Sequence, residues 1–233
     1  MLGFGILIVL LVIGSPIAFA ILLGVVGHVY TLPFNVSLVA QRIFSGLDSF
    51  SILAIPLFVL AGELMNESGI TSRIINFANA LVGHMKAGLA HVNIWASVIF
   101  AGLSGSAVAD TSALGRVFIP TMEKEGYPRA FAAALTAASS VIGPMIPPSI
   151  PVIIYALITT GVSVPALFLA GVTPGLFLAV ALSVYVYFFA GHYAPLKAKL
   201  SMKERWKAFV EALIPLFMPI FIVGSILTGI VTP

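Results

Sequence analysis

The chain has 233 residues, of which 60% are hydrophobic and only 8% are charged, a balance outside the range of soluble globular domains. It therefore indicates an integral membrane protein, and the net charge of +3 gives no reason to expect a nucleic-acid partner. The absence of cysteine excludes disulfides and thiolate metal sites.

The first 86 residues are expected to form scaffold-type helices with an interfacial connector. Residues 3–30 are apolar and lack a basic start, so they predict one helix long enough to cross the bilayer. Residues 37–50 form an amphipathic patch, and residues 51–67 predict a second span. In residues 70–85, apolar and polar side chains alternate at helical spacing, which predicts a helix lying along the membrane surface.

Residues 87–124 are too long for one ordinary span and carry a run of small polar residues at their centre. This run, "GLSGSAVADTSALG" at 102–115, includes four hydroxyl side chains and one acid. We therefore expect two half-length helices, 88–103 and 107–122, that meet at residues 104–106 near the middle of the membrane. Such a hairpin is re-entrant, because the chain returns to the side from which it came.

A discontinuous membrane helix is predicted for residues 127–160. Four prolines lie at its centre: Pro144, Pro147, Pro148 and Pro151. Because proline lacks the N–H donor and disfavours helix in the residue before it, an unbroken helix is not expected from about residue 143 to residue 151. With the hairpin, this helix would complete one element covering residues 87–160.

The remaining residues, 161–233, predict a helix at 164–190, a basic linker at 195–207 and an apolar run at 208–231 that begins a second repeat. With a cytoplasmic N-terminus, nine of the eleven basic residues fall on the cytoplasmic side, as the positive-inside bias requires. They are Arg73, Lys86, Lys124, Arg129, Lys197, Lys199, Lys203, Arg205 and Lys207. A simple span at 87–124 would put the basic linker outside, so this distribution also favours the re-entrant hairpin.

Two successive breaks in membrane helices favour a binding site over a structural kink, because unsatisfied backbone groups are costly in hydrocarbon. Carbonyl groups freed at helix ends, together with serine hydroxyls, form a hard-oxygen site suited to Na⁺. The N-terminal ends of half-helices favour an anionic group of a substrate.

Three stretches of the sequence resemble the large membrane subunit of tripartite ATP-independent periplasmic (TRAP) transporters. They are "QRIFSGLDSFSILAIPLFVLAGELMNESGI", "GHMKAGLAHVNIWASVIFAGLSGSAVADTSALGRVFIPTMEKEGY" and "FAAALTAASSVIGPMIPPSIPVIIYALITTGVSVPALFLAGVTPGL". The resemblance implies an all-α, multi-pass protein of the bacterial inner membrane, one half of an inverted-repeat elevator transporter. It implies uptake coupled to Na⁺, with no organic cofactor. The substrate would be an organic acid, such as a C4-dicarboxylate or a sialic acid. The implied partners are a small membrane subunit, a periplasmic binding protein and the lipid bilayer.

By the same resemblance, the hairpin tip and the proline break supply the site. The residues expected at Na⁺ are Ser104, Gly105, Ser106, Gly143, Ile146 and Pro148. Those expected at the substrate are Ser106, Asp110, Thr111 and Ser149. The chain covers little more than the first of two halves, so a second cation site and half of the substrate pocket are expected outside it.

Several residues have competing interpretations. Asp110 fits either a cation ligand or a partner of neighbouring backbone groups. Arg116 has the chemistry of a carboxylate clamp but lies three turns past the tip, which favours a structural role. His91, at the start of a half-helix, is expected to pack at the interface rather than bind a ligand.

Two other functions have some support in the sequence. The "GLSG" stretch resembles intramembrane serine proteases, with Ser104 as nucleophile. That chemistry needs a base within hydrogen-bond reach, and the one histidine downstream, His192, is expected at the membrane surface. An enzyme is therefore not expected. A passive anion channel is the other alternative, since broken helices also line channels.

Overall fold

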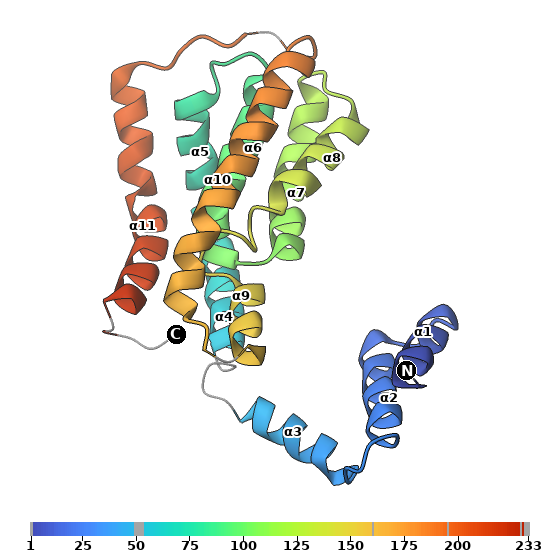
Figure 1. The fold of residues 1–233 in the computed structure, drawn as a ribbon. Helices are drawn as coiled ribbons and strands as arrows, with labels where there is room; N and C mark the ends of the chain where they lie inside the picture. Colours follow the sequence, from blue (N-terminus) through green and yellow to red (C-terminus); the bar gives the residue numbers. More distant parts are fainter. Residues whose placement is uncertain (1, 49–53, 160, 195, 229, 231–233) are drawn as a thin grey trace. The chain divides into compact units, whose positions relative to one another are not determined.

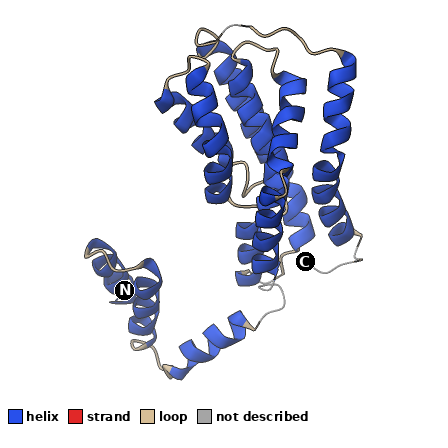
Figure 2. Cartoon of the chain, turned by 180° about the vertical axis from the view of Figure 1, so that it is seen from behind, coloured by secondary structure: helices blue, strands red, loops and turns tan. Residues whose placement is uncertain are grey.

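The computed structural model describes residues 2–48, 54–159, 161–194, 196–228 and 230. Every regular element among these residues is an α-helix, as the all-α prediction requires (Figure 2). The chain divides into two compact units, residues 1–52 and residues 53–233.

In the first unit, the predicted single span at 3–30 is wrong. The structure has two helices, α1 (Leu2–Val12) and α2 (Ile17–Val29), which pack against each other. Gly14 adopts a positive φ of 85° between them, and each helix is only about 16 to 20 Å long at 1.5 Å per residue. A third helix, α3 (Ser37–Leu47), matches the amphipathic patch. The cytoplasmic position of the N-terminus was predicted on the assumption that residues 3–30 cross the membrane once. It stays a prediction.

The second unit contains the remaining helices. They are α4 (Ala54–Glu67), α5 (Ile70–Val82), α6 (Gly88–Ser104), α7 (Ala107–Lys124), α8 (Arg129–Ser140), α9 (Ile150–Ile158), α10 (Val164–Phe189) and α11 (Met202–Leu227). Helices α6 and α7 start and end within two residues of the predicted half-helices. In the part of the chain that the structure describes, α10 and α11 are long and apolar enough to cross a membrane. The predicted span at 51–67 is helical from residue 54, and residues 51–53 lie outside the described part.

Two predictions for this unit need correction. Helix α5 does not lie across the end of the bundle but runs beside α6 and α11, where it buries Ile74 and Ala78 (Figure 1). The predicted helical periodicity of residues 70–85 was therefore correct, but the apolar face packs against other helices and not against the membrane surface. The basic linker is also shorter than predicted, because α11 already begins at Met202. The hydroxyl of Ser201 accepts from the backbone of Glu204, whose carboxylate accepts from the backbone of Ser201, and this capping box starts the helix.

Helix α6 lies at the centre of the core and packs against α5, α7, α8 and α10. Most of its residues are buried, and many are small, such as Ala90, Ala96 and Ala101. Small side chains let neighbouring helices approach closely, which is how membrane helices gain packing energy. The arm of the hairpin is thus the element on which the rest of this unit is assembled.

Buried hydrogen bonds join α6 to α8. The Asn93 amide nitrogen donates to the Thr136 hydroxyl at 2.7 Å, and the Ser97 hydroxyl donates to that of Ser139 at 2.9 Å. All four side chains are buried. These bonds hold the first arm of the hairpin against the helix that leads into the proline break.

The bond between Asn93 and Thr136 should contribute measurable stability. We expect Asn93→Ala and Thr136→Val, made singly and together, to show a coupling energy of about 0.5 to 2 kcal/mol, the range found for hydrogen bonds between membrane helices. Thermal or denaturant unfolding of the purified protein in detergent measures it. Thr121→Val, which removes a bond within α7 only, is the control and should be additive with Asn93→Ala. Additivity in both cycles would show that the buried bond has no stabilising role.

Candidate functional site

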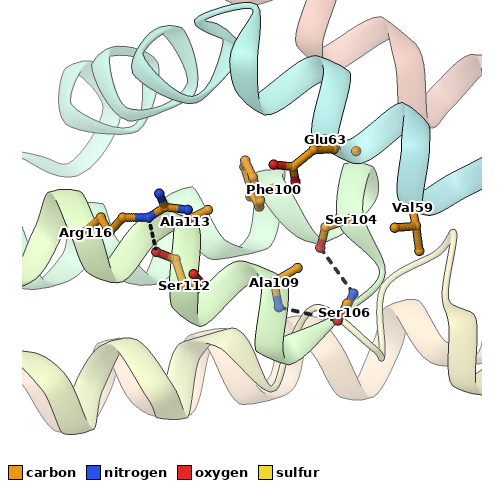
Figure 3. Close-up of a pocket in the computed structure, with 10 residues that line it drawn as sticks. Val59, Glu63, Phe100, Ser104, Ser106, Ala109, Ser112, Ala113 and Arg116 are labelled. Atoms are coloured by element: carbon orange, nitrogen blue, oxygen red, sulfur yellow. Dashed lines mark hydrogen bonds between the residues drawn. The ribbon is translucent and has the colours of Figure 1, made fainter.

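The hairpin tip consists of Ser104, the last residue of α6, and the two residues that join it to α7 (Figure 3). Helix α6 ends at Ser104, Gly105 adopts the left-handed conformation with φ 59°, and Ser106 is extended. The Ser106 hydroxyl caps α7 by accepting from the backbone N–H of Ala109 at 3.4 Å. The backbone N–H of Ser106 donates to the Ser104 hydroxyl at 3.2 Å. The serines therefore satisfy backbone groups that hydrocarbon would leave unpaired.

The proline break joins α8 to α9 through residues 141–149, which form turns rather than helix. The Ser149 hydroxyl donates to the Pro144 carbonyl at 2.6 Å and accepts from the backbone N–H of Val152 at 3.3 Å. Pro151 lies in the first turn of α9, where its missing N–H costs little. The predicted break is thus confirmed, although it ends two residues earlier than expected.

The tip and the break touch at two glycines. A Cβ atom on Gly105 would collide with the carbonyl oxygen of Pro148, and one on Gly143 would collide with the carboxylate of Asp110. At Gly105 the obstacle is backbone and the φ is positive, so only glycine fits, whereas a side chain at Gly143 would displace the Asp110 carboxylate. The predicted cation residues of the hairpin and of the break are therefore brought together.

Asp110 lies inside this contact and is fully buried. One of its carboxylate oxygens accepts a hydrogen bond from the Ser104 hydroxyl. The other, Oδ2, faces Gly143 and has no hydrogen-bond partner among the described residues. A buried carboxylate oxygen without a partner is costly, and a cation would compensate it. Asp110 was predicted at the substrate, with a cation ligand as an alternative, and the structure places it between the tip and Gly143.

The other predicted residues differ in their surroundings. The Ser149 hydroxyl is used within the break, and the Thr111 hydroxyl donates to the Ala107 carbonyl at 2.7 Å and faces a different cavity beside α7. The side chain of Ile146 packs against Gly175 of α10. Of the four residues predicted at the substrate, Ser106 alone lines the cavity at the tip.

That cavity, of about 170 Å³, lies between α4 and the hairpin (Figure 3). Its polar lining consists of Glu63 from α4 and Ser104, Ser106, Ser112 and Arg116 from the hairpin. Of these residues, Glu63 and Ser112 were not predicted at a site, and Arg116 was expected in a structural role rather than as a carboxylate clamp. The available signal was that charged residues inside membrane segments usually face protein or a cavity, not lipid.

Comparison with known proteins decides the family. Residues 4–233 match the model of the family described as "Tripartite ATP-independent periplasmic transporter, DctM component". The chain belongs to this DctM family. It is 44% identical to the sialic acid TRAP transporter large permease protein SiaM of Vibrio cholerae, over 77% of the chain and 42% of the relative. It is 42% identical to the 2,3-diketo-L-gulonate TRAP transporter large permease protein YiaN of Escherichia coli, over 73% and 40%. It is 38% identical to the C4-dicarboxylate TRAP transporter large permease protein DctM of Rhodobacter capsulatus, over 99% and 56%.

The DctM family is a family of transporter subunits, not of enzymes. Neither histidine considered as a base for Ser104 lies near it, whereas its hydroxyl donates to Asp110. In the same helix, His91 lies thirteen residues before Ser104, about 20 Å along the axis. His192 follows the far end of α10, in contact with Tyr193. The chain spans about half the length of the curated relatives that it matches.

The two-glycine contact makes a prediction about substitutions at the tip. Gly105→Ala should abolish transport while leaving membrane insertion intact, because the new methyl group would push the tip away from Pro148. Gly224→Ala in α11 is the matched control, since a Cβ there has no neighbour within 4 Å. Both variants are compared in uptake by vesicles containing equal amounts of protein. Equal uptake by the two variants would mean that the close approach of tip and break is not required.

Proposed function

We propose that this chain is part of a secondary transporter that takes up an organic acid together with Na⁺, and that the cation binds between the hairpin tip and the proline break. The observation that carries the proposal is the burial of the Asp110 carboxylate at this contact with one oxygen unpaired. Membership in the DctM family supports the transport function. The finer assignments, Na⁺ coupling and an elevator movement of the hairpin, are proposals from the geometry and the resemblance.

Four helix ends meet at the proposed site. Helices α6 and α8 end there at Ser104 and Ser140, and α7 and α9 begin there after Ser106 and Ser149. The C-terminal ends carry partial negative charge and attract a cation, whereas the N-terminal ends carry partial positive charge and attract an anion. One contact can therefore serve Na⁺ and the acid group of a substrate on adjacent faces.

The donors present fit Na⁺ well. They are oxygens of a carboxylate, of serine hydroxyls and of backbone carbonyls freed by the proline break, which are hard ligands. Asp110 would hold the ion by charge, and the carbonyl of Pro148 lies against Gly105 on the opposite side of the contact. When bound, Na⁺ would neutralise the buried carboxylate and tie the tip to the break.

The substrate and the partners are also inferred from relatives. The names of the relatives mention a sialic acid, 2,3-diketo-L-gulonate and C4-dicarboxylates, and each of these is an organic acid. The tripartite family description supports assembly with a small membrane subunit and a periplasmic binding protein in the bacterial inner membrane.

The cation assignment is tested by the Na⁺ dependence of uptake. The complete transporter in vesicles should take up its acid with Na⁺ and not with K⁺ at the same membrane potential, and only when the binding protein delivers it. Asp110→Asn should raise the Na⁺ concentration for half-maximal uptake by about tenfold or more, because it removes the charge that faces the ion. Thr121→Val, far from the tip on α7, should leave it unchanged.

Three outcomes would contradict parts of this account. Equal uptake in K⁺ would exclude Na⁺ coupling. Parental Na⁺ dependence in Asp110→Asn would exclude the carboxylate as a ligand. Uptake without exchange of labelled for unlabelled substrate across the membrane would indicate a channel rather than a carrier.

A further inference from the structure

Arg116 is a charged residue of the hairpin that the proposed cation site does not use. It lies on α7, ten residues after Ser106, which is about 15 Å along a helix. Its Nε donates to the carbonyl of Ser112 at 3.2 Å, so the side chain runs back along α7 towards the tip. The guanidinium group therefore lies closer to the tip than the backbone of Arg116 does.

The guanidinium group of Arg116 has no acidic partner within 4 Å in the described part of the chain. The ion pairs found there join Glu123 with Arg129, Glu125 with Lys197, and Lys207 with Glu211. Arg116 lines the cavity at the tip together with Ser104, Ser106 and Ser112. Arg116 is exposed and also lines two further cavities beside α7, but neither of those includes Ser104 or Ser106. An arginine in an apolar bundle needs a polar partner, and the cavity at the tip offers the serine hydroxyls beside it.

Glu63 lines the same cavity from α4, and Figure 3 shows both charged side chains projecting into it from different helices. Gly62, the neighbour of Glu63, lies against the end of α6, since a Cβ there would be in ordinary contact with the carbonyl of Leu103 at 3.5 Å. The two opposite charges therefore face each other across the cavity without forming an ion pair.

We propose that Arg116 binds the carboxylate of the transported acid in this cavity, and that Glu63 is the counter-ion of Arg116 when the acid is absent. The inference rests on the proposed transport of an organic acid. Guanidinium binds a carboxylate through two parallel hydrogen bonds. Glu63 and a substrate carboxylate would therefore compete for Arg116, and each would bind it only when the other does not. Ser112 and Ser106, the latter in the tip itself, also line the cavity and would supply polar contacts for the rest of the substrate.

The test uses the complete transporter assembled around this chain, with a sialic acid and succinate as probes. Arg116→Gln should raise the KM for the transported acid at least about tenfold, because it removes a charged hydrogen-bond pair. Arg116→Lys should restore part of that loss, since the charge remains while the two-bond geometry is lost. Glu63→Gln should lower the KM by removing the competing carboxylate. Arg129→Gln is the matched control, because Arg129 already pairs with Glu123, and its KM should equal that of the parent.

A second measurement separates this inference from the proposed Na⁺ site and from a loss of folding. The rise in melting temperature on adding Na⁺ should be the same in Arg116→Gln and in the parent. A parental KM in Arg116→Gln would overturn the inference, and so would an equal loss of the Na⁺ effect and of uptake, which would indicate a structural role. Absence of a Na⁺ effect in the parent would instead contradict the proposed function, while the comparison of KM values would still decide the role of Arg116.

The absence of cysteine from the chain allows an independent check. A cysteine in Ser112→Cys, which lines the same cavity and keeps Arg116, should react with a negatively charged methanethiosulfonate, and a saturating concentration of the transported acid should slow the reaction. Unchanged labelling in the presence of an acid that the transporter demonstrably takes up would place the substrate elsewhere.

Discussion

The close approach of Gly105 to the carbonyl of Pro148 is the contact on which the organisation of the second unit depends. It joins two places where a helix stops inside an apolar bundle, and each of these would leave backbone groups unpaired on its own. Ser106 and Ser149 satisfy the first N–H groups of α7 and α9, and the two glycines leave room for the opposing chain. The pairing of the two breaks therefore gathers backbone and hydroxyl groups that would be costly to leave unpaired into one polar centre.

The packing of α6 against its neighbouring helices supports this polar centre. The small residues of α6 let it sit among its neighbours, and its bonds from Asn93 and Ser97 fix α8 in register with the hairpin arm. At the opposite end of the hairpin, Tyr193 packs against Tyr127 and Phe131, and Lys197 pairs with Glu125. Tip and break are thus carried by one packed body, as the elevator movement that we propose would require.

Much of this unit could be predicted from the sequence because its signals are local. Prolines at 144 to 151 exclude a continuous helix, and the small residues around Gly105 mark a turn, so both breaks were found within two residues. The split at Gly14 was missed because the hydrophobicity of residues 3–30 was given more weight than the turn signal of Gly14, Ser15 and Pro16. The placement of α5 was wrong because an apolar stripe packs equally well on lipid or on protein. The roles of Asp110 and Arg116 depended on which way each face of α7 points, and that is set by tertiary contacts.

The most direct test of the central claim is hydrogen exchange of backbone amides in the complete transporter, in Na⁺ and in K⁺ at equal ionic strength. If one cation ties the tip to the break, exchange should slow in Na⁺ at residues 104–106 and at residues 141–149 together, with the same Na⁺ concentration dependence. Helix α3, in the other unit, should show no change. Protection of only one of the two segments, or equal protection in K⁺, would contradict a shared Na⁺ site.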